Sequence, residues 1–284
     1  MSNVIITPRS LWQALDAPAL RLFDCRFRLD DPGAGRRLWE QEHIPGAIHA
    51  DLDAHLSSRV TPESGRHPLP VPAHFLAWCQ RNGIDHDVRV VCYDDAGGAF
   101  AARLWWLLAV WLEHPRVEVL DGGFPFWCEQ GYPTTAAHPP NPPPTQWSPE
   151  PRWDRVLTTS RMESLIEQGA PSPVFLDARS AERFRGDVEP IDPVAGHIPG
   201  AVNRPFTENL DPQGRWRPAD ELYKAFRALP CEDVVHMCGS GVTACHNALA
   251  YAYAGMDTGF TLYAGSWSEW VRDPRRPVAV GPDR

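Results

Sequence analysis

The chain has 284 residues, which is long enough for two domains of ordinary size that each bury a hydrophobic core. Hydrophobic residues make up 43% of the sequence and 12 residues are tryptophan, so the composition excludes an intrinsically disordered chain. The formal net charge of −9 argues against nucleic acid or an anionic membrane as the main partner, and no apolar run reaches the length of a membrane span.

The cysteines and the N-terminal segment indicate the cellular compartment of the protein. The seven cysteines are an odd number without CxxC pairs, and no cysteine-histidine cluster has the spacing of a zinc site. The first residues lack the basic leader and apolar stretch of a secretion signal. We therefore expect a reduced, cytoplasmic, monomeric protein that uses neither a metal nor an organic cofactor.

Short motifs of the first half of the chain return in the same order in the second half. The matching pairs are 23–26 with 176–179, 43–47 with 197–201, 90–94 with 234–238, and 122–127 with 265–270. The second pair is identical, reading His-Ile-Pro-Gly-Ala in both places. Because the period has the size of a domain, the sequence predicts two copies of one fold.

A proline-rich stretch, residues 138–144, separates the two copies. Proline fixes φ and removes backbone donors, so this stretch is neither a helix nor a central strand, and we expect an extended, stiff connector. The sequence therefore predicts a first domain at residues 1–137, a linker at 138–152 and a second domain at 153–284.

Strand-like and helix-like stretches alternate within each copy. Residues 89–93 and 116–120 are short β-branched runs, and residues 99–108 between them have the composition of a helix. This alternation predicts an α/β fold in which a mostly parallel sheet is covered by helices on both faces.

Cys238 stands between a strand-like stretch, residues 233–237, and a helix-like stretch, residues 244–251. A thiol in this place faces backbone N–H groups and the positive end of a helix dipole, and both favour the thiolate. The glycines of the loop allow the backbone to curl around the sulfur. The loop residues concerned are Gly239, Ser240, Gly241, Val242 and Thr243. The competing interpretation is a buried core cysteine.

The run Cys-Gly-Ser-Gly-Val-Thr-Ala resembles the active-site loop of the rhodanese-type sulfurtransferases, in the version typical of 3-mercaptopyruvate sulfurtransferases. Thiosulfate-preferring relatives usually carry basic residues where Gly239 and Ser240 stand. The His-Ile-Pro-Gly-Ala boxes and residues 265–270 match further signatures of the family, so the resemblance covers nearly the whole chain and implies two tandem rhodanese-like domains. A cysteine phosphatase would need an arginine at the position of Ala244, which excludes that class.

The resemblance implies an inactive first domain and a catalytic second one. Alignment of the two copies places Asp94 opposite Cys238, and a carboxylate cannot form a persulfide. The first copy is also longer, mainly in the segment 53–72, which is rich in glycine and proline. That segment is either a passive surface loop or part of the active site.

The resemblance assigns roles to residues outside the loop. The family places an Asp and a His beside the loop serine, and the matching residues are Asp53 and His67, with Ser240. The carboxylate-binding arginine of the family matches Arg183, and Arg179 is a second candidate at the same strand end. The usual second arginine is replaced by Ile191, while Ala264 and Cys245 receive no functional interpretation.

These observations predict a sulfurtransferase that moves sulfane sulfur from 3-mercaptopyruvate through a Cys238 persulfide to a thiol, cyanide or thioredoxin-like acceptor. One alternative is a thiosulfate sulfurtransferase that uses the same cysteine. Another is a non-catalytic binding module with the same fold, and a weaker one is a cysteine protease that pairs Cys238 with His236 or His246. We expect His43 and His197 to be structural.

Overall fold

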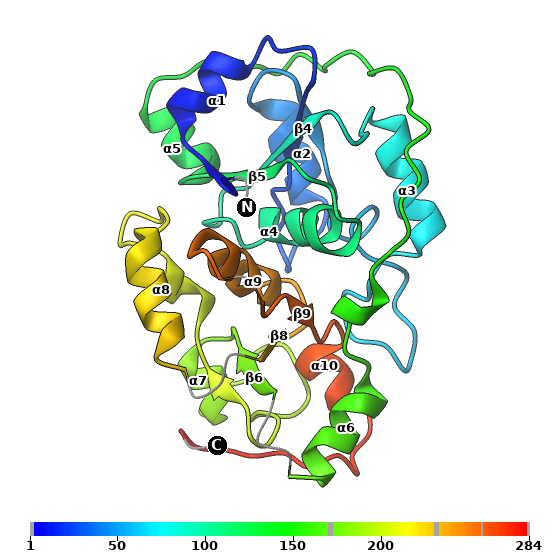
Figure 1. Ribbon diagram of the computed structural model, residues 1–284, viewed down its shortest axis with the longest axis vertical. Helices are drawn as coiled ribbons and strands as arrows, with labels where there is room; N and C mark the ends of the chain where they lie inside the picture. Colours follow the sequence, from blue (N-terminus) through cyan, green and yellow to red (C-terminus); the bar gives the residue numbers. More distant parts are fainter. Residues whose placement is uncertain (1–2, 170–172, 230–232, 257, 283–284) are drawn as a thin grey trace. The chain divides into compact units, whose positions relative to one another are not determined.

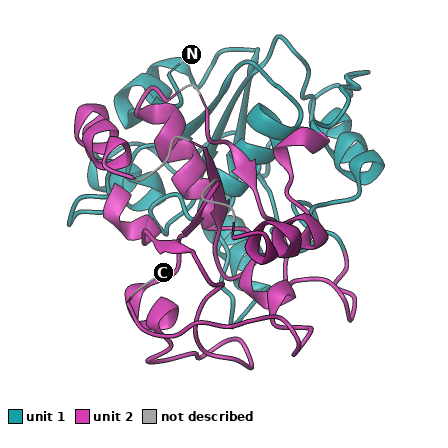
Figure 2. Cartoon of the chain, turned by 60° about the horizontal axis from the view of Figure 1, so that its bottom comes forward, with its two compact units in different colours: residues 1–58, 69–152, 210–216 teal, residues 59–68, 153–209, 217–284 magenta. Residues whose placement is uncertain are grey.

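The computed structural model describes residues 3–169, 173–229, 233–256 and 258–282. The chain forms two compact units, which Figure 2 shows in different colours. Unit 1 consists of residues 1–58, 69–152 and 210–216, and unit 2 of residues 59–68, 153–209 and 217–284. The proline-rich residues 138–152 are thus counted with unit 1. Unit 2 takes a short segment, residues 59–68, from the first half of the chain.

Within the described residues, unit 1 has a sheet of five strands in the order β1-β5-β4-β2-β3, and every pairing between these strands is parallel (Figure 1). The strands are β1 (Ile5–Ile6), β2 (Leu20–Asp24), β3 (Ala47–His49), β4 (Arg89–Tyr93) and β5 (Val117–Leu120). The helices are α1 (Pro8–Ala14), α2 (Ala34–Gln41), α3 (Pro72–Arg81), α4 (Ala101–Trp105) with its π-helical continuation η1 (Trp106–Trp111), and α5 (Gly123–Glu129).

Both faces of the unit 1 sheet are covered by helices. Val91 of β4 packs in one cluster with Leu11 of α1 and Trp127 of α5. On the other face, Phe23 of β2 lies against Trp78 of α3, with ring centroids 5.2 Å apart. Side chains alternate across a strand, so adjacent residues serve opposite faces.

Within the described residues, unit 2 has a parallel sheet of four strands in the order β7-β6-β8-β9. The strands are β6 (Val174–Asp177), β7 (Val202–Asn203), β8 (Val234–Met237) and β9 (Thr261–Leu262). The helices are α6 (Thr159–Glu167), α7 (Ala181–Arg185), α8 (Ala219–Arg227), α9 (Ala244–Tyr253) and α10 (Ser266–Trp270), with the 3-10 turns η2 (Trp153–Arg155) and η3 (Phe206–Asn209).

The unit 2 sheet is also covered on both faces. Phe175 of β6 packs with Met162 of α6 and Trp267 of α10. On the opposite face, His236 of β8 meets Tyr251 of α9 edge to face, with ring centroids 5.0 Å apart. The predicted architecture, a mostly parallel sheet between two layers of helices, is therefore present in both units.

The pairing of β6 with β8 positions the candidate site. These neighbouring strands are parallel, and Asp177 at the end of β6 is in register with Met237 at the end of β8. Their carboxyl ends consequently meet at one edge of the sheet, which is where ligands bind in open α/β sheets. The loop that begins at Cys238 and the segment of α7 leave from this same edge.

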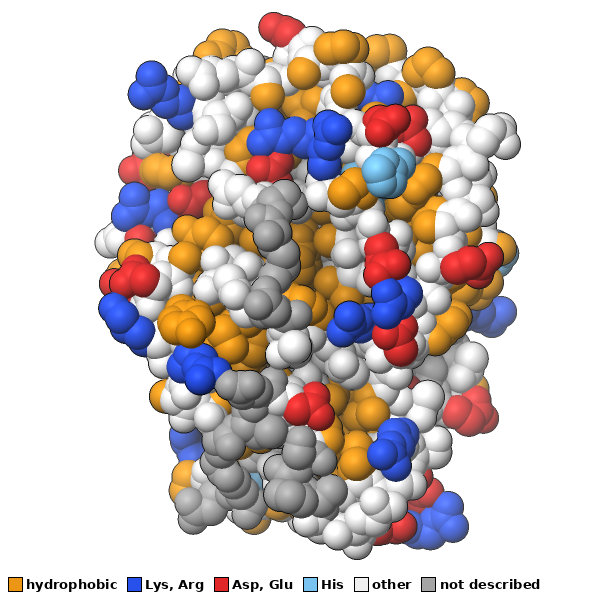
Figure 3. Space-filling model, viewed as in Figure 1, with side chains coloured by type: hydrophobic (Ala, Val, Ile, Leu, Met, Phe, Trp, Pro, Cys, Tyr) orange, Lys and Arg blue, Asp and Glu red, His pale blue; other side chains and the backbone are white. Residues whose placement is uncertain are grey.

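The surface and the cysteines agree with the composition. On the face that Figure 3 shows, basic side chains are interspersed with acidic ones. No helix in the described ranges is long and apolar enough to cross a membrane. The cysteines in those ranges form no disulfide, and Cys231 lies outside them.

His236 makes the stability of the protein depend on pH. Burial lowers its pKa from 6.5 to about 4, against the opposing effect of the hydrogen bond with the carbonyl of Gly259. Below pH 6.5 the unfolded chain takes up a proton that the folded chain binds only near pH 4. As the pH falls through this window, stability therefore decreases by up to about 1.4 kcal/mol per pH unit.

We expect the unfolding free energy of His236→Gln to fall less than that of the wild type between pH 6.5 and 4, as measured by urea unfolding. The Gln amide can still donate a hydrogen bond to the carbonyl of Gly259. The control is His86→Gln, because His86 is exposed at the surface. Equal slopes for the wild type and His236→Gln would contradict the prediction.

Candidate functional site

Cys238 follows directly on β8 and is almost completely buried, with 2% of its surface exposed. Its Sγ accepts a hydrogen bond from the backbone N–H of Gly241 at 3.2 Å. The next helix, α9, begins at Ala244 and directs its N-terminus toward the loop. The N–H of Gly241 and the N-terminus of α9 thus place positive partial charge near the sulfur.

Gly241 is the turning point of the loop. Its φ of +75° lies in the left-handed region, and a Cβ at this position would come within 2.5 Å of the carbonyl oxygen of Ala264. The carbonyl of Gly241 also accepts a hydrogen bond from Sγ of Cys245 at 3.3 Å. Ala264 and Cys245, which the sequence left without a function, thus pack against the turn that aims an amide at Cys238.

The closing box, residues 265–270, makes two hydrogen bonds with the loop that begins at Cys238. Oγ of Ser266 accepts the backbone N–H of Cys238 at 3.1 Å, and the N–H of Ser268 donates to the carbonyl of Gly239 at 2.9 Å. The sequence interpretation took this box only as a family signature and missed its contacts with Cys238 and Gly239. The repeated motif was the only signal that could have pointed to it.

The structure brings His67 and Ser240 together. Nδ1 of His67 lies 2.7 Å from Oγ of Ser240, and the residues are 5% and 6% exposed. Both belong to unit 2, because His67 lies in the segment 59–68. A buried imidazole that shares a proton with a hydroxyl beside Cys238 can donate or accept a proton there.

Asp53, the third member of the predicted set, belongs to unit 1. Its backbone N–H donates to Oδ1 of Asp51 at 2.9 Å. Burial, with the nearby Asp51 carboxylate, raises the pKa of Asp53. Its participation in the site remains a prediction.

Arg179 has a structural role in unit 2. It is buried and bonds Asp177 through Nη2 at 2.7 Å and Nε at 3.0 Å, and Nη2 also donates to the carbonyl of Gly196 at 2.8 Å. The matching pair in unit 1, Arg26 with Asp24, has the same geometry. Because unit 1, which has no cysteine at the position of Cys238, keeps this pair, the geometry favours Arg183 over Arg179 as the group that would contact a substrate.

Arg183 extends from α7 and retains 15% exposure of its side chain. It bonds Glu189 through Nη2 at 2.7 Å and Nε at 3.2 Å, and Nη2 also reaches Asp192 at 3.1 Å. Ile191, the residue in place of the usual second arginine, is 44% exposed.

Arg66, which the sequence interpretation did not single out, lies at the loop of residues 238–243. A Cβ built on Gly239 would be 2.9 Å from Nη2 of Arg66 and 3.5 Å from Nη1 of Arg183. The loop residues are neutral, as the sequence shows, but the site receives positive charge from other segments. Arg66 stands in a stretch rich in glycine and proline, where no local pattern marks a binding residue.

The loop of unit 1 shows what this backbone arrangement binds. Asp94, at the position matching Cys238, is completely buried, and its carboxylate accepts four backbone hydrogen bonds of 2.8 Å each. The donors are Ala96, Gly98, Phe100 and Ala101. Burial raises the pKa of Asp94, and these four amides oppose that rise. Unit 1 therefore forms an amide cradle, the set of these four backbone N–H donors, and fills it with its own carboxylate.

The histidines that stand in or near the sequence motifs have structural partners. His43 and His197 lie within 2.6 and 2.8 Å of the carbonyl oxygens of Trp39 and Phe184. His236 bonds a backbone carbonyl on the α9 face of the sheet. No group of three or more metal-ligating side chains occurs within the described ranges.

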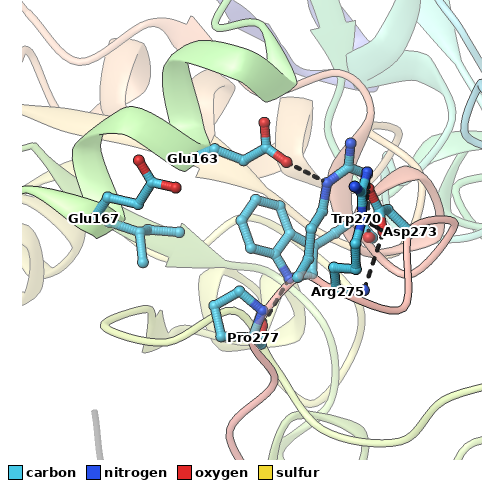
Figure 4. A pocket seen from close by; sticks show the side chains of 8 residues that line it. Glu163, Glu167, Trp270, Asp273, Arg275 and Pro277 are labelled. Carbon is cyan, nitrogen blue, oxygen red and sulfur yellow. Dashed lines mark hydrogen bonds and ion pairs between the residues drawn. The ribbon is translucent and has the colours of Figure 1, made fainter.

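A separate pocket of about 280 Å³ lies among α6, α10 and the segment that follows α10 (Figure 4). Its arginines are already paired, Arg276 with Glu163 at 2.6 Å and Arg275 with Asp273 at 2.7 Å. It contains none of the predicted site residues, so we place the candidate site at the Cys238 loop.

Comparison with known proteins identifies the family. Residues 7–130 and 158–273 each match the Rhodanese-like domain. The chain belongs to the rhodanese-like family. The two matches coincide with the two predicted copies, which confirms the tandem arrangement expected from the repeated motifs.

Curated relatives match over almost the whole chain. The chain is 46% identical over 286 residues to a probable 3-mercaptopyruvate sulfurtransferase of Pseudomonas aeruginosa, covering 99% of both chains. It is 34% identical to the 3-mercaptopyruvate sulfurtransferase of Homo sapiens (100% and 97% covered) and 33% identical to the thiosulfate sulfurtransferase of Gallus gallus (95% and 94% covered). The prediction of a sulfurtransferase is confirmed at this level.

Solved structures give the same result. The 3-mercaptopyruvate sulfurtransferase from Leishmania major superposes with a TM-score of 0.80 at 33% identity, covering 94% of this chain and 74% of that one. The crystal structure of SseA from Escherichia coli has a TM-score of 0.77 at 28% identity, covering 94% and 100%. The rhodanese fold predicted from the sequence is therefore confirmed.

The turn at Gly241 can be tested against a matched glycine. Gly255 has a similar φ of +80°, but a Cβ there would meet nothing within 4 Å. We expect Gly255→Ala to cost about 1 kcal/mol, the cost of the left-handed conformation alone. Gly241→Ala adds a clash with the Ala264 carbonyl, so it should cost roughly 3 kcal/mol and lower sulfur transfer about 100-fold through displacement of the loop.

Urea unfolding and initial rates of thiocyanate formation measure the two effects. Equal stability and equal activity of the two variants would show that the loop is not constrained at Gly241.

Proposed function

We propose that this protein takes sulfane sulfur from 3-mercaptopyruvate onto Cys238 and passes it to a thiol, cyanide or thioredoxin-like acceptor. The observation that carries the proposal is the Cys238 thiol at the end of β8, bonded to the Gly241 amide, with the His67–Ser240 hydrogen bond in the same unit. A persulfide-forming site needs a sulfur nucleophile, donors that stabilise its charge and a proton carrier, and these residues supply all three.

In the first step the Cys238 thiolate attacks the sulfur of 3-mercaptopyruvate. A bond forms between Sγ and that sulfur, the bond between the sulfur and carbon of the donor breaks, and its electron pair stays on carbon as the enolate of pyruvate. The enolate takes up one proton at carbon, so the net reaction moves the donor's thiol proton to the methyl group of pyruvate. We assign this proton transfer to Ser240, and its hydrogen bond with His67 supports the assignment.

In the second step an acceptor thiolate or cyanide attacks the outer sulfur of the persulfide. The sulfur-sulfur bond breaks, the sulfur leaves with the acceptor, and the Cys238 thiolate is restored. The equivalent loop of unit 1 supports the proposal of a persulfide by analogy. It holds the two carboxylate oxygen atoms of Asp94 in its amide cradle. An outer sulfur on Cys238 would extend beyond Sγ much as these oxygens extend beyond Cγ of Asp94.

The choice of donor rests on the proton that the enolate needs. Thiosulfate leaves as sulfite, which requires no protonation at carbon, whereas the enolate requires a donor such as the hydrogen-bonded Ser240 hydroxyl. Arg183, which is only partly buried, is proposed to bind the donor's carboxylate. We further propose a cytoplasmic monomer that binds neither nucleic acid nor membrane, in keeping with the net charge of −9.

We expect Cys238→Ser to abolish sulfur transfer, because a hydroxyl cannot accept sulfane sulfur, while unfolding stability changes little. Cys128→Ser is the control, since Cys128 is exposed. Mass spectrometry of the wild type after donor treatment should find one added sulfur on Cys238. Appreciable thiocyanate production by Cys238→Ser would refute the assignment, and no production by the wild type would favour the non-catalytic binding module.

The His67–Ser240 pair should matter for one donor only. We expect His67→Ala and Ser240→Ala each to lower kcat/KM for mercaptopyruvate by about 100-fold, because general acid-base catalysis contributes 10²–10⁴-fold, and to change thiosulfate turnover little. His74→Ala, at an exposed position of α3, is the control. A wild type that uses thiosulfate faster than mercaptopyruvate would overturn the donor while leaving the Cys238 chemistry intact.

A further inference from the structure

Unit 1 contains a cavity of about 590 Å³ to which the proposed sulfur transfer gives no role. It lies among α2, the end of β3, the end of α3 and the proline-rich segment 138–144, all of which belong to unit 1. Its volume falls within the range of cavities that hold small organic ligands, about 300–1,000 Å³. Two arginines and three histidines are among the described residues that line it, and no carboxylate is.

The proline-rich segment forms a stiff wall of this cavity. Its first residue, His138, packs on Trp39 of α2 with ring centroids 4.6 Å apart. Directly after the segment, Thr145 donates its backbone N–H to the carbonyl of Gln80 at 3.0 Å and its hydroxyl to that of Ile84 at 2.5 Å. Because both ends are attached to unit 1 and the prolines fix φ, this wall is ordered before any ligand binds.

His55 presents a fixed hydrogen-bond donor to the cavity. Its Nδ1 accepts the backbone N–H of Asp51 at 3.0 Å, which places the proton of the neutral ring on Nε2. Burial lowers the pKa of His55, so the ring is neutral at pH 7. The imidazole stacks on Trp78 with ring centroids 5.4 Å apart, and the indole holds its orientation. Nε2 has no hydrogen-bond partner within the described residues, so its proton is available to a ligand.

His49, at the end of β3, differs from its counterpart in unit 2. The repeated motifs match it with Asn203. The amide of Asn203 donates to the carbonyls of Asp177 and Arg179, at 3.1 and 2.9 Å. His49 makes one long contact, from Nε2 to the carbonyl of Arg26 at 3.5 Å, and its Nδ1 is an acceptor without a partner in the described part of the chain. Unit 1 therefore has, at this position, a side chain that can bind a ligand as well as the backbone.

The arginines give the cavity positive charge in a chain whose net charge is −9. Arg81 stands in the last turn of α3, and among the described residues it has no ion-pair partner. Arg36 of α2 pairs with Glu40 at 2.8 Å. Asp51, whose charge acts on His55, has Oδ1 occupied by two backbone N–H groups. Arg81 and the His55 donor together favour an anionic oxygen group such as a phosphate.

The cavity also suits a flat ring. The imidazoles of His55 and His138 are each supported by a tryptophan, and aromatic faces of this kind stack on planar rings. Nδ2 of Asn82 donates to the carbonyl of Trp78 at 2.8 Å, which leaves Oδ1 as an acceptor. With Nδ1 of His49, the cavity thus offers two acceptors to N–H groups at the edge of a ring. The three histidines are not arranged for a metal, because no group of three metal-ligating side chains occurs in the described ranges.

We propose that this cavity of unit 1 is a second binding site, for a small organic phosphate that carries a planar nitrogenous ring, which is the chemistry of a nucleotide. The phosphate binds Arg81 and Nε2 of His55. The ring lies against the imidazoles of His55 and His138, and its edge donates to Nδ1 of His49. The proposal is independent of the sulfur donor, because none of these residues belongs to the Cys238 site.

The test uses adenosine monophosphate (AMP) as the probe and isothermal titration calorimetry of the full chain to measure its Kd. We expect one AMP per chain, with adenosine and inorganic phosphate each bound roughly tenfold more weakly, because each lacks one of the two recognised groups. Arg81→Ala should raise the Kd of AMP about fivefold through the loss of a charge-assisted contact at an exposed position. His49→Asn, which introduces the residue of unit 2, should raise it about threefold through the loss of an acceptor.

Two variants serve as matched controls and should leave the Kd of AMP unchanged. Arg37 lies next to Arg36 on α2, but it pairs with Asp31 and does not line the cavity, so Arg37→Ala tests the general effect of charge. Arg183→Ala tests whether AMP binds instead at the arginines of unit 2. Urea unfolding of each variant checks that the fold is kept.

The outcomes separate the site from its alternatives. No saturable AMP binding at millimolar concentrations, or a Kd that rises in Arg183→Ala and not in Arg81→Ala, would overturn the proposal. Equal affinities for AMP and inorganic phosphate would refute the role of the ring, and equal affinities for AMP and adenosine would refute the role of the charge. Thiocyanate formation by Arg81→Ala and His49→Asn should stay within about twofold of the wild type, and its loss in both would contradict a site separate from Cys238.

Discussion

The site depends on one constraint: a buried side chain that accepts hydrogen bonds must be held by backbone N–H groups where a central parallel strand ends. In unit 1 this side chain is the carboxylate of Asp94, and in unit 2 the matching position is the sulfur of Cys238. Amides held in place by the turn of the chain can stabilise an anion without reorganisation. The two units thus use one backbone device with different occupants.

The duplication also explains an unusual backbone conformation. Gly123 in unit 1 and Ser266 in unit 2 are matched positions, with φ of +56° and +52°. In unit 1 a side chain is excluded, because a Cβ would lie 2.2 Å from the carbonyl of Asp94. Unit 2 accepts the strain of a serine there, and its hydroxyl bonds the N–H of Cys238 at 3.1 Å. Such strain is typical of positions that serve a function.

Much of this arrangement could be predicted from the sequence. Alternating strands and helices predicted the parallel sheets, the repeated motifs predicted two copies, and family resemblance paired His67 with Ser240 across a long separation in the chain. Arg66 and Asp192 could not be predicted, because their partners come from segments distant in sequence and neither belongs to a periodic pattern. Local sequence specifies strand ends and turns, whereas the meeting of side chains from different loops is decided by tertiary packing.

The arginines change the basis on which a donor is chosen. The neutral residues Gly239 and Ser240 suggested a site with little positive charge, but Arg66 and Arg183 place two guanidinium groups beside the loop. Asp192 and Glu189 balance that charge from inside the same unit. Both candidate donors are anions, so attraction to the arginines serves either one. The difference lies in the leaving group, since only a carbanionic product needs the proton that a hydroxyl bonded to an imidazole can transfer. Under the proposed function, the positive charge would attract anionic donors of either kind, and proton transfer would favour the donor whose product is a carbanion.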